Sequence, residues 1–327
     1  MDATTFTSTG TTQTVTNAGG FKPDLIWSKS RTTTDGNDLN DSVRGASKYL
    51  VSFSTAAEAT DANFITSFNS NGFSIGTSNY SNGQNIVAWQ WQAGQGNTVV
   101  NSTGTITANV STSTTAGFSI AKWTSTSTGA ATIGHGLGVA PACILIKLSS
   151  ASGNFWTMYH QSLGNTTRVC INNSDPASAG NSGFWNNTSP TTSVFSVGSD
   201  SNTNGNSYVG YIWAAVPGFS AFGSYVGNGS TDGPFIYTGF NPALVIVKNT
   251  SVTGNWLIFD NKRPGYDPIG GNLYPNLNIA EDTGAVIDFL SNGFKMRRAS
   301  NANDNQNGNT YVYAAFASTP FKYSNSF

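Results

Sequence analysis

The sequence predicts an all-β protein made of three tandem antiparallel modules that are β-sandwich-like or jelly-roll-like. The chain has 327 residues, of which only 9% are charged, and it is rich in glycine, with 36 residues. Aromatic residues make up 12% of the chain, a content that disordered sequences avoid because large apolar rings drive burial. Many aromatic residues among many turn formers are typical of short strands joined by tight turns. No long stretch has helical apolar spacing.

An internal threefold repeat gives the expected domain organisation. An aromatic residue precedes a proline at nearly equal intervals in each third of the chain, at Phe6 and Pro23, Trp123 and Pro141, and Tyr225 and Pro242. We therefore predict modules at residues 1–94, 119–217 and 218–327. The segment 95–118, rich in threonine, serine and asparagine, is predicted to be either a linker or an added strand.

An apolar run follows each of these prolines, and such a run predicts a buried strand. The runs end in Lys29, Lys147 and Lys248, whose stems we expect on the sheet and whose ammonium groups we expect in water. A shared polar position follows in each module, occupied by Asp41, His160 and Asp260. A catalytic or metal-ligand role would require one residue type there, so the variation favours a polar residue at a strand end.

Each module then closes with two short strands separated by an Asn-Gly pair. The three copies contain Gly83, Gly205 and Gly308. Asn-Gly between alternating strands predicts a β-hairpin, because both residues tolerate the positive φ of a twist-matched turn. Residues two apart share a strand face, so the side chains of residues 87, 89 and 91 are expected to face a core.

The two cysteines, Cys143 and Cys170, stand where other modules carry hydrophobic residues. This predicts buried free thiols, with a disulfide as the alternative. The formal net charge of −1 gives no basic field for nucleic acid or anionic lipid. No apolar run is long enough to span a bilayer, and the threonine-rich start lacks the features of a signal peptide. We therefore expect no nucleic-acid partner and no membrane insertion.

Two histidines and scattered acidic residues offer little material for acid–base catalysis. We expect no enzyme, no catalytic residue, no metal site and no cofactor. His135 lies in a glycine-rich loop that is predicted to be a turn, because a strand follows it and not the helix of a phosphate loop. The loop 200–205 matches half of a calcium-binding pattern, but Tyr211 occupies the position of the required carboxylate. A hairpin is favoured there, and calcium binding stays open.

Aromatic residues beside amides are the most site-like feature of the sequence. The candidate binding residues, for a glycan or a protein partner, are Trp156, Trp185, Asn186 and Tyr266. Sugar-binding surfaces offer an apolar plate to the sugar ring and amides to its hydroxyls. The favoured alternative is that these aromatic residues fill module cores or subunit contacts.

Six segments together resemble a known group of proteins. They are PDLIWSKSR (23–31), DSVRG (41–45), GHGLGVAP (134–141), YHQSLG (159–164), GNGSTDGPF (227–235) and AAFASTPFKY (314–323). As an ordered set they look like the tandem modules of uncharacterised virion structural proteins of marine tailed bacteriophages, of the tail-fibre, appendage or capsid-decoration type. The resemblance covers nearly the whole chain and implies a place on the virion, at the particle surface or in the tail.

The expected function is therefore a non-enzymatic structural component of a bacteriophage virion that contacts other virion proteins, with contact to the host as an option. The alternative is a lectin-like module that recognises a host surface glycan, and a polysaccharide depolymerase is less favoured. Such appendages are commonly homo-oligomers, so we expect self-association, with a trimer as one form.

Overall fold

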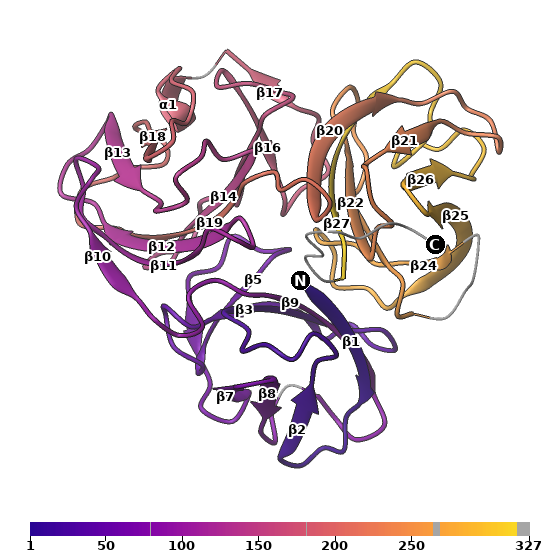
Figure 1. Ribbon diagram of the computed structural model, residues 1–327, viewed down its shortest axis with the longest axis horizontal. Coiled ribbons are helices and arrows are strands. Elements are labelled where there is room, and N and C mark those ends of the chain that lie inside the picture. The colour runs from indigo at the N-terminus through magenta and orange to yellow at the C-terminus, as the bar shows by residue number, and fades with distance from the viewer. Residues whose placement is uncertain (79, 181, 264–268, 319–327) are drawn as a thin grey trace.

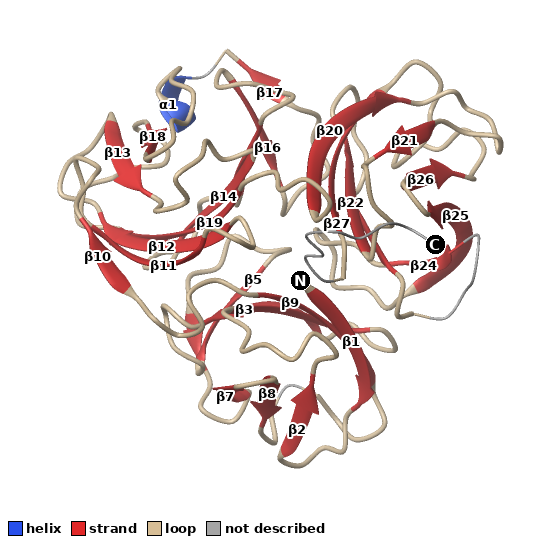
Figure 2. Ribbon diagram, in the orientation of Figure 1, coloured by secondary structure: helices blue, strands red, loops and turns tan. Residues whose placement is uncertain are grey.

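The computed structural model describes residues 1–78, 80–180, 182–263 and 269–318, and strands dominate this part of the chain (Figures 1 and 2). The one helix in the described residues is the single turn α1 (Ser182–Trp185). Named strands pair antiparallel with their neighbours. The predicted all-β, sandwich-type fold is confirmed.

The strands fall into three units that surround a common centre (Figure 1). Unit one has a six-stranded sheet of β1 (Asp2–Thr7), β9 (Asn85–Trp91), β3 (Leu25–Ser30), β4 (Gly36–Asp41), β5 (Lys48–Val51) and β6 (Ala59–Thr60), in that order. Its second sheet is β2 (Gln13–Thr16), β8 (Gly72–Ile75) and β7 (Ile65–Asn69). Val15, Phe73 and Ile86 fill the space between the two sheets, which makes unit one a sandwich.

Unit two has the largest sheet. Its order is β10 (Val99–Asn101), β11 (Ala108–Ser113), β12 (Phe118–Thr124), β19 (Ser207–Trp213), β14 (Cys143–Leu148), β15 (Thr157–His160), β16 (Thr167–Cys170) and β17 (Ser178–Ala179). A small sheet of β13 (Ala131–Gly134) and β18 (Val194–Val197) accompanies it. β10 and β11 come from the segment 95–118 and extend the sheet beyond β12.

Unit three consists of two four-stranded sheets. The first is β20 (Ser220–Val226), β27 (Thr310–Phe316), β22 (Leu244–Asn249) and β23 (Leu257–Asp260). The second is β21 (Phe235–Tyr237), β26 (Gly293–Met296), β25 (Asp282–Leu290) and β24 (Ile269–Asn272). The strand orders β1-β9-β3-β4, β12-β19-β14-β15 and β20-β27-β22-β23 are equivalent, so residues can be matched between units by strand register. The boundaries predicted at residues 94, 118 and 217 stay predictions.

The predicted Asn-Gly hairpins are wrong. β8 and β9 do not pair, because β8 lies in the small sheet of unit one and β9 lies in the large one. β18 and β19 are separated in the same way, as are β26 and β27. The loop glycines do have positive φ, with +85° at Gly83 and +79° at both Gly205 and Gly308. The Asn-Gly turn is therefore part of a longer loop that carries the chain from one sheet of a sandwich to the other.

The strands that follow these turns are buried on both faces. In β9, Val87, Trp89 and Trp91 belong to a core shared by all three units, as predicted for a core-facing set. Ile86 and Ala88 point the other way, into the sandwich of unit one. The large sheet of unit one is thus covered by its own small sheet on one side and by the centre of the molecule on the other.

The prediction that the strand-end lysines reach water is wrong. Lys29, Lys147 and Lys248 are fully buried, and their ammonium groups donate to main-chain carbonyls instead. Lys29 Nζ bonds the carbonyls of Ser30, Thr33 and Asp35 at 2.8, 3.0 and 2.8 Å. Loops that fold back over each strand end supply these acceptors, and no local sequence pattern showed that the loops would do so. Burial lowers the pKa of all three lysines to about 8.

Candidate functional site

Three aromatic side chains meet at the centre of the molecule. Trp91, Trp213 and Phe316 occupy equivalent positions at the ends of β9, β19 and β27. Their ring centroids are 6.1 Å apart for Trp91 and Trp213, 5.7 Å for Trp91 and Phe316, and 6.4 Å for Trp213 and Phe316. Aromatic pairs at such distances add to the stability gained from burial alone. This triad gives each unit a contact with both of the others.

A second set of contacts passes from each unit to the previous one around the centre. Trp156 Nε1 donates to Val51 O at 2.9 Å, Trp256 Nε1 donates to Cys170 O at 2.8 Å, and Asn37 Nδ2 donates to Tyr274 O at 2.9 Å. The donors are equivalent by strand register, and the acceptors come from units one, two and three in turn. Because unit one also bonds unit three, the three units form a closed ring.

Two of the buried lysines strengthen the same ring. Lys147 Nζ bonds Thr55 O of unit one at 3.2 Å, and Lys248 Nζ bonds Ser174 O of unit two at 3.0 Å. Lys147 also bonds the carbonyls of Leu148 and Asn154 in its own unit. Each of these ammonium groups therefore fixes a loop of the preceding unit to the edge of the next sheet.

The shared polar position forms a junction between units in every case. Asp41 accepts from Tyr211 Oη at 2.8 Å and forms a buried salt bridge with Arg44. Asp260 accepts from Trp89 Nε1 and from Arg263 Nε, at 2.9 and 2.8 Å. Burial raises the pKa of Tyr211 well above its ordinary value, so its phenol keeps the proton that it donates. These carboxylates are occupied by structural contacts, in keeping with the predicted strand-end role.

The third junction has no charge. His160 Nδ1 accepts from the amide of Ser162 at 3.2 Å, which leaves Nε2 to donate to Tyr313 O at 3.1 Å. Leu163 stands where the other units carry Arg44 and Arg263. Burial lowers the pKa of His160 to about 4, so the ring is neutral at pH 7.

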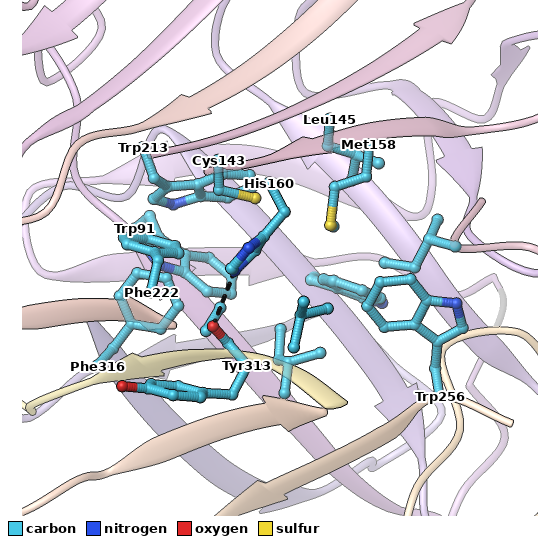
Figure 3. Close-up of a pocket in the computed structure, with 15 residues that line it drawn as sticks. Trp91, Cys143, Leu145, Met158, His160, Trp213, Phe222, Trp256, Tyr313 and Phe316 are labelled. Carbon is cyan, nitrogen blue, oxygen red and sulfur yellow. Dashed lines mark hydrogen bonds between the residues drawn. The ribbon is translucent and has the colours of Figure 1, made fainter. Parts of the chain in front are cut away.

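A small cavity lies beside His160 (Figure 3). Its volume is about 30 Å³, and its walls are apolar. Ala314 is one of the lining residues, and by strand register it occupies the position of Trp89 and Tyr211 in the other units. Because alanine has no ring at this position, the space that Trp89 and Tyr211 fill in the other units is left empty. Cys143 and Met158 also line it, as Figure 3 shows. Burial raises the pKa of the Cys143 thiol far above neutrality, which disfavours a reactive thiolate in the cavity.

Two of the predicted binding residues, Trp156 and Trp185, are buried in the interior. Trp156 is fully buried and stacks on Tyr211, with ring centroids 6.2 Å apart, so it cannot offer a plate to a sugar. Trp185 is also buried and packs edge-on against Tyr159. Asn186 is exposed, with φ +50°, and Tyr266 lies outside the described residues. For Trp156 and Trp185, the structure agrees with the alternative that these rings fill the interior.

A surface cleft that the sequence analysis missed lies on unit two. Its lining includes Phe155, Thr157, Arg168, Phe184, Ser199 and Asp200, and we call it the Arg168 cleft. The cleft has a volume of about 370 Å³, within the usual range for small-molecule sites. The guanidinium carbon of Arg168 lies 3.8 Å from the ring centroid of Phe184 and 5.9 Å from that of Phe155. The signal that could have found it is the alignment of Arg168 with Tyr49.

Other expectations for sites have mixed outcomes. Cys143 and Cys170 are buried free thiols, as predicted. His135 is buried and bonds Thr191 O and the amide of Leu137, in a loop where Gly136 and Gly138 have positive φ.

Within the described ranges, no three side chains of His, Cys, Asp or Glu gather as a metal site would require. No helix in this part of the chain is long and apolar enough to cross a membrane.

Comparison with known proteins identifies a family but not an activity. The family described as "Domain of unknown function (DUF7483)" matches residues 1–320. No curated protein and no solved structure matches the chain.

Proposed function

We propose that this chain, which belongs to the DUF7483 family of unknown function, is a non-enzymatic structural component of a bacteriophage virion. The resemblance of its ordered motifs to virion proteins supports the location, at the particle surface or in the tail. The closed ring of three units supports the structural role. A protein with this role contacts other virion proteins and self-associates, and a trimer is one form that it takes.

The observation that carries the structural role is where the ionisable groups are used. Asp41, Asp260 and His160 each bind a neighbouring unit, and the ammonium groups of Lys147 and Lys248 do the same. Active sites instead hold perturbed groups in a cleft, within reach of a substrate. Here His160, Lys147 and Lys248, whose pKa values are lowered by burial, hold neighbouring units together.

The location is tested on purified particles. Virions from a culture that produces this protein are separated by density gradient, and their proteins are identified by mass spectrometry and cryo-electron microscopy. The expected result is a constant number of copies per particle, with density that fits the three-unit ring. A chain that stays in the soluble fraction while intact virions sediment without it would refute the proposal.

The absence of catalysis is tested separately. Envelope polysaccharide from candidate hosts is incubated with the purified protein, and released oligosaccharides are measured. The expected result is no release above that of a heat-denatured sample. Release that the native protein alone produces would favour the depolymerase.

A further inference from the structure

Arg168 replaces Tyr49, a partly buried tyrosine of the equivalent strand in unit one that packs against the core. The β4–β5 register pairs Asp38 with Val51 and Asn40 with Tyr49, and the β15–β16 register pairs Thr157 with Cys170. Continuing this register places Arg168 at the position of Tyr49. Tyr49 packs edge-on against Phe64, with ring centroids 5.7 Å apart. In unit two an aromatic ring is again present beside this position, that of Phe184, but it packs against the guanidinium of Arg168 and not against a tyrosine ring.

The charge of Arg168 has no carboxylate partner in the described part of the chain. Arg44 and Arg263 are both paired with aspartates, whereas Arg168 forms no salt bridge there. Its Nη1 donates to Cys170 Sγ at 3.3 Å, and sulfur is a weak acceptor. Its Nε is buried and has no acceptor. A buried donor without an acceptor is costly, so an incoming anion would gain from bonding this edge of the guanidinium.

The remaining walls of the Arg168 cleft suit a sugar. Phe155 is 43% exposed and its ring lies beside the guanidinium, and an exposed ring can pack on the apolar face of a pyranose. Ser199 and Thr203 line the cleft with hydroxyl groups, and the carboxylate of Asp200, which accepts from Ser199 Oγ at 3.3 Å, also lines it. Because the lining combines one cation with hydroxyl groups and an exposed ring, it favours a ligand that carries both an acid and hydroxyls. α1, which holds Phe184, lies on the outer side of unit two, and β16, which holds Arg168, runs along the side of unit two that faces unit three (Figure 1).

We propose that the Arg168 cleft binds an acidic saccharide. The carboxylate of a uronic acid pairs with the guanidinium of Arg168, one sugar ring packs on Phe155, and the hydroxyls bond the residues around the cleft. Planar guanidinium groups match carboxylates in both charge and shape. This inference goes beyond the proposed place on the virion and does not depend on it, because binding is measured on the isolated protein.

The test compares two ligands that differ in charge. Digalacturonic acid and its methyl ester have the same sugar rings, but only the acid carries carboxylates. Each is titrated into the purified protein and followed by saturation-transfer NMR and calorimetry. The acid is expected to bind at least about tenfold more tightly than the ester, since a charge-assisted pair is lost in the ester.

Variants assign the binding to the cleft. Arg168→Tyr copies unit one, so it keeps a ring against Phe184 while it removes the charge, and it is expected to weaken binding of the acid at least about tenfold. Phe155→Ala is expected to weaken both ligands by about fivefold through loss of the ring contact. Tyr237→Ala, which removes an exposed aromatic residue of unit three, is the matched control and should leave binding unchanged. Near-ultraviolet circular dichroism and thermal unfolding check that each variant is folded.

Several results would overturn the proposal. Equal affinity for acid and ester would remove the role of Arg168, and so would full affinity in a folded Arg168→Tyr variant. No binding of digalacturonic acid up to about 50 mM, where even weak sugar sites with about millimolar affinity are occupied, would remove the site. Tighter binding of the acidic peptide acetyl-Glu-Glu than of the disaccharide would show that the cleft recognises protein and not sugar. A negative result in any of these leaves the virion test unaffected.

Discussion

Two kinds of junction hold one ring together. Between units one and two, Asp41, Arg44 and Tyr211 bond one another. At the junction between units three and one, Asp260 bonds both Arg263 and Trp89. Between units two and three, one neutral histidine bonds a carbonyl beside an apolar cavity.

The difference shows which residues change together. His160 replaces the aspartate, Leu163 replaces the arginine, and Ala314 replaces the large aromatic residue. Removing one member of a buried ion pair leaves an uncompensated charge, whereas removing both is much less costly. Of the three equivalent junctions, two therefore hold a complete aspartate–arginine pair and one holds neither charge. None of the three holds an aspartate without its arginine.

The largest expected effect comes from creating that half-charged form. Arg44→Met leaves the carboxylate of Asp41 buried without its cation, and it should lower the free energy of unfolding by about 3–5 kcal/mol. Urea denaturation followed by tryptophan fluorescence measures the change.

The double variant Asp41→His with Arg44→Leu is the control, because it copies the neutral junction. In it, the new histidine has the local geometry of His160, whose Nδ1 accepts from the amide two residues later. We expect it to recover at least half of the stability that Arg44→Met loses. A double variant that is less stable than the single one would show that the junction type depends on its surroundings and not on the pair.

The second prediction uses pH to distinguish the junctions. The pKa of His160 is about 4 in the folded protein and about 6.5 when unfolded. Below pH 6.5 the unfolded state binds more protons, so stability falls as the pH drops toward 4. From pH 8 to pH 5, His160 should cost about 2 kcal/mol of unfolding free energy.

His160→Gln isolates this contribution, because its amide can still donate to Tyr313 O but does not titrate. The difference between wild type and variant is measured by urea denaturation at pH 8 and pH 5. His135, whose pKa is also lowered by burial, is present in both proteins and cancels. Equal pH dependence in the two proteins would mean that His160 does not stay neutral at the junction.

The smallest expected effect comes from filling the cavity. Ala314→Leu places a side chain in the space that Trp89 and Tyr211 fill elsewhere, and it should stabilise the protein by about 1 kcal/mol. Thermal unfolding would show a rise in Tm. Ala88→Leu, at a fully buried position on β9, is the control that should destabilise through overpacking. Destabilisation by both would mean that the neutral junction cannot accept the larger side chain.

The sequence was sufficient for the fold class and for the core faces of the strands, because alternation and turn residues are local properties. Val87, Trp89 and Trp91 face a core as predicted, and the two cysteines are buried. The Asn-Gly turns have the expected backbone, but local pattern cannot say whether the strands on either side pair with each other or with strands from elsewhere in the chain. Here they join opposite sheets of a sandwich.

The candidate site was less accessible from sequence for the same reason. Trp156 follows Asn154 and Phe155 in the sequence, as a residue of a sugar-binding loop could, yet it is buried against unit one, which supplies the acceptor Val51 O. The buried lysines depend on loops of their own and neighbouring units. Arg168 looks like an ordinary surface residue unless the repeats are aligned, and the register of β15 and β16 confirms that it occupies the position of Tyr49.

The ring has one join that the backbone does not cross. Peptide bonds link unit one to unit two and unit two to unit three, whereas unit three meets unit one through side chains and hydrogen bonds, among them Asp260 with Trp89, Asn37 with Tyr274 and Arg31 with Glu281. Under tension applied between the two ends of the chain, we expect this join to separate first, because peptide bonds also link the units at the other two joins. We therefore expect the side-chain contacts at this join to set the load at which the ring opens.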